Sequence, residues 1–210
     1  MTRGEAGQAW RMNLPNRLTV ARMLLTFLFI VLLSFENLFC LTLGYLVFIG
    51  ATITDYYDGK IARKRNLVTN FGKLIDPVAD KILVAAAFVM LMLLDDLHIP
   101  GWVVVVIIGR EFLVTGARSL AASDGVVIGA NVWGKSKAII QMAYVYCFLG
   151  LVILKDLLDW VVPGDLVRWF GGAVKTSSLW AAVAVALLTV YSGFQFAWIN
   201  WKALKLDSSS

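Results

Sequence analysis

The chain has 210 residues, of which 60% are hydrophobic and 16% are charged, and its formal net charge is +5. Soluble globular domains contain about 45–50% apolar residues, so this composition indicates an integral membrane protein. The basic residues lie beside apolar segments, where membrane topology and anionic lipid headgroups account for them, and we expect no nucleic acid partner. The two cysteines, Cys40 and Cys147, lack metal-ligand spacing and are read as core residues.

The N-terminal residues 1–12 are read as a flexible polar tail, and residues 13–205 as one membrane domain. Residues 13–22 read Asn-Leu-Pro-Asn-Arg-Leu-Thr-Val-Ala-Arg, in which Pro15 suits a helix start and the two arginines oppose the apolar positions. This pattern predicts a short interfacial helix that bends into the first membrane span.

Apolar segments long enough to cross a membrane occupy most of the chain, since a crossing of roughly 30 Å takes about 20 residues. They cover residues 18–35, 38–57, 74–94, 101–122, 136–158 and 177–201. We therefore expect an all-α, polytopic membrane protein with six transmembrane helices and the short N-terminal interfacial helix. Pro163 and the glycines at 164, 171 and 172 predict an outer loop over 159–176.

Basic residues are distributed unequally between the two sides of this topology. With both termini in the cytoplasm, the tail and the two inner loops, near 58–73 and 123–135, carry most of the lysines and arginines. The outer side holds Lys155, Arg168 and Lys175 among several aspartates. The positive-inside rule therefore predicts that both termini face the cytoplasm.

Four aspartates stand at the inner ends of the second and third spans. Asp55 and Asp58 are three residues apart, and Asp76 and Asp80 are four apart, so each pair shares one helix face. The loop between the two helices is short, which makes them antiparallel neighbours. We expect the four carboxylates to converge just inside the membrane surface.

A cluster of four carboxylates at that depth needs positive charge, because the groups repel one another and resist desolvation. Oxygen ligands select Mg²⁺ or Mn²⁺, and four carboxylates can bridge two ions about 4 Å apart, the arrangement used for in-line phosphoryl displacement. The alternative is that these acids cap helices or pair with Lys64, Arg65 and Lys81. Pro77 is expected in the first helical turn, which places the start of the regular third helix near Asp76.

The whole stretch 55–80 reads Asp-x2-Asp-Gly-x2-Ala-Arg-x8-Gly-x3-Asp-x3-Asp, and it resembles the complete signature of the CDP-alcohol phosphotransferase family. The resemblance implies a six-helix homodimer, a site with two metal ions, and release of CMP from a CDP-linked donor. It implies that all four aspartates bind metal and that Asp80 is also the base that takes the acceptor's proton. The residues expected to hold the cytidine diphosphate are Gly59, Ala62, Arg63 and Gly72.

Four basic residues farther along the chain indicate the type of acceptor. Arg110 lies inside an apolar run and Arg118 lies two turns beyond it, while Lys135 and Lys137 open the fifth span. A buried arginine needs an anion, so together these cations predict a site for a phosphorylated alcohol. The alternatives are that Arg110 merely pairs with Glu111 to lock helix packing, and that the lysines are ordinary anchors.

These stretches, with residues 13–22, are similar to the bacterial phosphatidylglycerophosphate synthases. The resemblance implies transfer from CDP-diacylglycerol to glycerol 3-phosphate, in a bacterial inner membrane, with the active site facing the cytoplasm among membrane lipids. Two alternatives stay open: an inositol-phosphate or cardiolipin-forming member of the family, and a divalent-cation transporter. The absence of an internal repeat and the position of the acids at one face argue against the transporter.

Overall fold

The computed structural model describes residues 14–65, 70–123, 125–126, 128–129 and 132–201, and in this part the chain is helical without strands. The predicted tail over 1–12 lies outside the described residues. The helices are α1 (Leu14–Leu33), α2 (Leu38–Arg65), α3 (Asn70–Leu93), α4 (Gly101–Ser123), α5 (Val132–Leu158) and α6 (Gly164–Ile199). The all-α class predicted from the sequence is confirmed.

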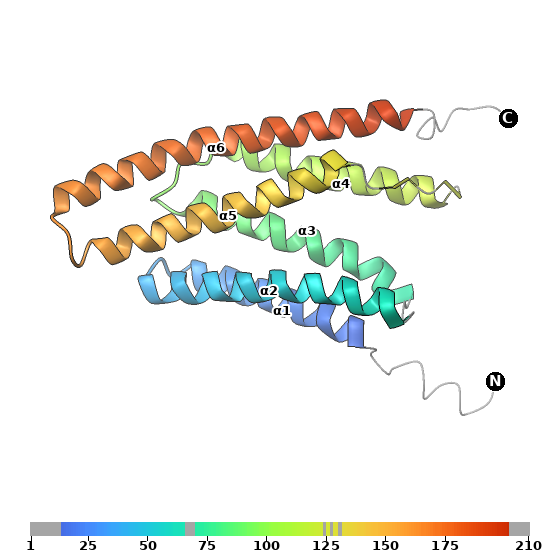
Figure 1. Ribbon diagram of the computed structural model, residues 1–210, viewed down its shortest axis with the longest axis horizontal. Helices are drawn as coiled ribbons and strands as arrows, with labels where there is room; N and C mark the ends of the chain where they lie inside the picture. Colours follow the sequence, from blue (N-terminus) through green and yellow to red (C-terminus); the bar gives the residue numbers. More distant parts are fainter. Residues whose placement is uncertain (1–13, 66–69, 124, 127, 130–131, 202–210) are drawn as a thin grey trace.

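The six helices lie lengthwise in one bundle, with successive helices running in opposite directions (Figure 1). One end, here called the terminal end, is where α1 begins and α6 ends. At that end α2 finishes and α3 starts, and likewise α4 finishes and α5 starts. The connection between α2 and α3 and the connection between α4 and α5 therefore lie at the terminal end.

Aromatic side chains hold α2 and α3 against α5 in the core. The rings of Phe48 and Tyr146 meet edge-on with centroids 5.2 Å apart, and Phe29 packs on Phe48 at 5.3 Å. Phe88 of α3 stacks on Tyr144 of α5 at 5.5 Å. Large buried rings contribute most to core packing, so α5 is the common support for both aspartate-bearing helices.

The segment that carries the signature is more helical than the sequence indicates. The inner loop expected at 58–73 is wrong, because α2 continues to Arg65 and α3 already begins at Asn70. Apart from Gly59, the end of α2 is built from residues that tolerate a helix well. Pro77 lies inside α3 and not in its first turn, so the expected start near Asp76 is also wrong; the helix continues there without one backbone hydrogen bond.

The N-terminal segment is not a separate helix. The expected interfacial helix is wrong, since α1 runs without interruption from Leu14, and Pro15 is accommodated in the first turn, where its missing N–H costs nothing. Arg22 was expected on the polar face of that helix, but it is only 2% exposed. The N-terminal segment therefore contributes a buried charge to the bundle.

The outer loop expected over 159–176 is likewise mostly helix. Pro163 precedes the first residue of α6, so the connection shrinks to the residues between Leu158 and Gly164. Gly171 of α6 faces the Lys155 side chain of α5, since a Cβ at this position would lie in ordinary van der Waals contact with it at 3.6 Å. The two buried valines of this segment, Val167 and Val174, explain why the glycines do not break the helix.

Two of the described helices are long and apolar enough to cross a membrane, over Ser136–Leu158 and Gly164–Ile199. Shorter apolar stretches occupy Thr19–Leu33, Leu38–Thr54 and Lys81–Leu93. The charged residues inside α4 keep that helix from the same class. Many large apolar side chains are exposed on the outside of the bundle, such as Phe39 and Leu113 at 75% and 74%, as expected of a surface in lipid.

Candidate functional site

The four signature aspartates lie in the halves of α2 and α3 that are nearer the terminal end of the bundle. Asp55 and Asp58 fall in the second half of α2, and Asp76 and Asp80 in the first half of α3. Both pairs stand in continuous helix, so each pair occupies one face. Their side chains lie outside the described part of the structure, as do those of the expected cytidine diphosphate residues Gly59, Ala62, Arg63 and Gly72. The convergence of the carboxylates stays a prediction.

The chemistry of this donor set fits a divalent metal. Carboxylate oxygens are the preferred ligands of Mg²⁺ and Mn²⁺, and two pairs on two helices provide enough of them for more than one ion. Among the side chains that the structure describes, no three histidines, cysteines or acids come together as an alternative metal site. The aspartates therefore remain the candidate ligands.

The partly buried acid Glu111 joins two of the four predicted acceptor-site cations. Its Oε1 accepts a hydrogen bond from Arg110 Nη1 at 3.3 Å and another from Lys137 Nζ. The side chains of Arg110, Glu111 and Lys137 are 11%, 14% and 9% exposed. The pairing of Arg110 with Glu111, proposed as a packing lock, is present, and it also brings Lys137 of α5 to α4.

Arg110 is held from a third helix as well. Its Nη2 donates a hydrogen bond of 2.9 Å to the Ser192 hydroxyl of α6. The neighbouring Gly193 leaves room for the arginine stem, because a Cβ there would lie 3.1 Å from Arg110 Cγ and 3.4 Å from Nε. Three helices therefore determine the position of this guanidinium group.

Arg118 lies nearer the terminal end and has a different environment. Its guanidinium carbon is 5.1 Å from the centre of the Phe196 ring, and its Nη2 is 3.9 Å from the position of a Cβ at Gly134. Within the described residues Arg118 forms no ion pair, and its buried Nε has no hydrogen-bond partner. The side chain of Lys135, in the first turn of α5, lies outside the described part.

The set formed by Arg110, Glu111, Arg118 and Lys137, here called the cation cluster, carries three positive charges and one negative charge. Farther from the terminal end, Gln141 Nε2 donates a 3.3 Å hydrogen bond to Thr189 Oγ1, with both residues at most 2% exposed. Charged side chains within apolar helices are costly, and those that occur face the bundle interior, pair with one another and mark functional sites. The position and net charge of the cation cluster make it a candidate anion site.

Sequence reasoning missed Ser192, Gly193 and Phe196, because α6 reads as an ordinary apolar span. The available signal was their spacing: small or polar residues at 189, 192 and 193 and an aromatic ring at 196 share one helix face. It also missed the burial of Arg22, which no feature of its apolar neighbours indicates.

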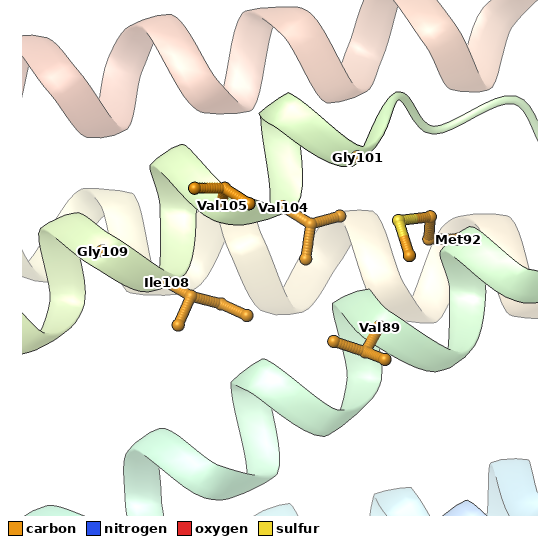
Figure 2. A pocket seen from close by; sticks show the side chains of 7 residues that line it. All are labelled: Val89, Met92, Gly101, Val104, Val105, Ile108 and Gly109. Atoms are coloured by element: carbon orange, nitrogen blue, oxygen red, sulfur yellow. The ribbon is translucent and has the colours of Figure 1, made fainter.

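A groove of about 490 Å³ lies between α3 and α4 (Figure 2). Neither the signature aspartates nor the residues of the cation cluster line it. Figure 2 shows Val89 and Met92 facing Val104 and Ile108 across it, and the glycines at 101 and 109 open its wall. None of its lining side chains can ionise or donate a hydrogen bond, so the groove cannot carry the reaction.

Comparison with known proteins places the chain among lipid-synthesising enzymes. Residues 12–188 match the family model for CDP-alcohol phosphatidyltransferases. A Bacillus subtilis protein named CDP-diacylglycerol–glycerol-3-phosphate 3-phosphatidyltransferase is 41% identical over 208 residues, which cover 93% of this chain and 99% of that protein. A Rickettsia typhi protein of the same name is 39% identical, with 87% and 96% covered. A probable phosphatidylglycerophosphate synthase of Mycobacterium tuberculosis is 32% identical, with 91% and 83% covered.

Proposed function

The chain belongs to the CDP-alcohol phosphatidyltransferase family, and from this premise we propose that it transfers the phosphatidyl group of CDP-diacylglycerol to glycerol 3-phosphate. The products are phosphatidylglycerophosphate and CMP. Relatives named for this reaction match most of the chain, and the cation cluster is the observation that carries the choice of acceptor. Its excess of positive charge, partly buried between α4, α5 and α6, can bind the phosphate of a phosphorylated alcohol, whereas a neutral alcohol offers no anion to these cations.

The donor side of the reaction is assigned to the signature residues of α2 and α3. Members of this family use divalent metal ions. Two Mg²⁺ or Mn²⁺ ions would supply positive charge for the diphosphate and for the departing CMP. Their proposed ligands are Asp55, Asp58, Asp76 and Asp80. The residues proposed to hold the cytidine diphosphate are Gly59, Ala62, Arg63 and Gly72.

Asp80 is the proposed base. It takes the proton from the free primary hydroxyl of glycerol 3-phosphate, whose oxygen then attacks the lipid-side phosphorus in line. One phosphorus–oxygen bond forms to the acceptor, the bond to the CMP oxygen breaks, and CMP leaves with that electron pair. The atoms balance without a further reactant.

The acceptor phosphate is assigned to the cation cluster, with Lys135 as an additional ligand. Arg118 is the direct contact in this proposal, because its charge faces an aromatic ring and no acid within the described residues. Arg110 and Lys137 share Glu111, which keeps both cations on one side of the site. These two cations and the carboxylate that they share sum to a formal charge of +1.

In the proposed topology all six helices cross a bacterial inner membrane, with the terminal end in the cytoplasm. The soluble acceptor then enters from the cytoplasm, and CDP-diacylglycerol enters sideways from the inner leaflet with its acyl chains in lipid. The basic residues concentrated at that end support this orientation. We also propose a homodimer, as the family resemblance implies.

The deciding experiment is CMP release by the purified protein in detergent or vesicles with CDP-diacylglycerol. We expect release to require both a divalent metal and glycerol 3-phosphate, and to yield phosphatidylglycerophosphate. Inositol phosphate and phosphatidylglycerol serve as competing acceptors in the same assay. Faster CMP release with either of them, or with unphosphorylated glycerol, would overturn the assignment of the acceptor.

A further inference from the structure

Three uncharged residues of α6, namely Ser192, Gly193 and Phe196, contact the two arginines of the cation cluster. This set is called the α6 support. Ser192 and Phe196 are 4% and 5% exposed, so neither side chain is available to solvent. None of the three has a place in the family signature at 55–80. Their common feature is contact with a guanidinium group.

The contacts of the two arginines on α6 lie closer together along the helix axis than the two arginines lie on α4. Arg110 and Arg118 are eight residues apart in α4, which corresponds to about 12 Å along the helix axis. Their contacts on α6, Ser192 and Phe196, are four residues apart, or about 6 Å. α4 and α6 run in the same direction (Figure 1), so the long arginine side chains converge toward one level of the bundle.

The two contacts also orient the arginines without adding negative charge. The Ser192 hydroxyl accepts one hydrogen bond from Arg110, and Gly193 lets the stem of that arginine lie against the α6 backbone. The face of the Phe196 ring attracts the Arg118 guanidinium through its quadrupole. A carboxylate in either place would compete with an incoming phosphate, whereas a hydroxyl and a ring leave the positive charge available.

We propose that Ser192, Gly193 and Phe196 are positioning residues that hold Arg110 and Arg118 together for one phosphate group of the acceptor. This inference rests on the proposed function, because it assigns a role within the acceptor site. The α6 support acts through the arginines and touches neither the donor nor the reacting atoms.

The test is steady-state kinetics of the full-length protein with each substrate varied separately. Phe196→Leu and Ser192→Ala are expected to raise the KM for glycerol 3-phosphate by about fivefold or more, as loss of one cation–π contact or one charged hydrogen bond predicts. The KM for CDP-diacylglycerol should stay within about twofold of the wild-type value, because the support lies at the acceptor side. Phe196→Tyr and Ser192→Thr keep the ring and the hydroxyl and should restore the wild-type KM.

Two matched controls lie in the same helix. Thr189→Val removes a buried hydroxyl that accepts a hydrogen bond from Gln141 and, within the described residues, forms none with an arginine. Gly172→Ala adds a methyl group where a Cβ meets nothing within 4 Å, in contrast to Gly193→Ala, where it meets Arg110. Neither control should change the KM for glycerol 3-phosphate, whereas Gly193→Ala should raise it.

Arg118→Gln separates this inference from the proposed function. In one outcome the KM for glycerol 3-phosphate rises in Arg118→Gln but is unchanged in Phe196→Leu and Ser192→Ala. This outcome overturns the role of the α6 support and agrees with the proposed acceptor site. An unchanged value in Arg118→Gln refutes the acceptor site and the support with it. The positioning role is overturned if the KM values for both substrates rise equally, in Phe196→Leu and in Phe196→Tyr alike. If Phe196→Leu fails to fold, the comparison of Ser192→Ala with Ser192→Thr decides.

Discussion

Neutralising Glu111 tests the arrangement of the cation cluster. Glu111→Gln keeps the size of the side chain and removes the carboxylate charge that Arg110 and Lys137 share. All three side chains are less than 15% exposed, so water compensates little for the loss. Removing one partner of a buried ion pair costs about 3–5 kcal/mol, and the residual exposure of these side chains places this site near the lower value, about 3 kcal/mol. For a chain of this length that corresponds to a fall in Tm of roughly 6–12 °C.

The assay is thermal unfolding of the purified protein in detergent, with Glu36→Gln as the matched control. Glu36 is exposed in the turn between α1 and α2, so the same substitution there should leave the Tm within about 1 °C of the wild-type value. A double-mutant cycle of Glu111→Gln with Lys137→Met should give a coupling free energy of about 1–3 kcal/mol. A Tm for Glu111→Gln equal to that of the control would refute the reasoning, because the carboxylate would then not hold the two cations together.

Three further predictions test other parts of the molecule. Asp80→Asn should lower CMP release by about 10²–10⁴-fold, the contribution of a general base, with an unchanged Tm; near-normal turnover would exclude Asp80 as the base. Lys155→Met removes the 2.5 Å ion pair with Asp96 at the opposite end of the bundle, and thermal unfolding should show a loss of about 1 kcal/mol with unchanged turnover. Gly44→Ala places a methyl group against a buried leucine of α1 and should destabilise the protein by about 1–3 kcal/mol. In the control Gly50→Ala the added methyl group meets nothing within 4 Å, and the substitution should stabilise the protein by up to about 1 kcal/mol. Equal effects of the two alanines in denaturation would contradict the packing of α1 on α2.

The helical class and the delivery of the aspartates to one end follow from local patterns. Apolar runs of membrane-spanning length predict helices without knowledge of their neighbours, and alternating directions then bring the end of α2 and the start of α3 together. The helix boundaries were less predictable. Pro77 and Gly171 disfavour a helix by propensity, yet they lie inside α3 and α6, whereas Pro163 directly precedes α6, where a proline is compatible with a helix start.

The spacing of residues within one helix shows which side chains share a face. On this basis the sequence by itself determined the helical class and the family resemblance, and it predicts the metal-binding pattern. Which helices are neighbours was decided only by the tertiary structure. Arg110 and Ser192 are separated by 82 positions, and no periodicity in either segment relates them. The burial of Arg22 and the contact of Arg118 with Phe196 depend in the same way on packing between helices. A buried cation is stabilised by its surroundings in space, and those surroundings come from segments that are distant in the chain.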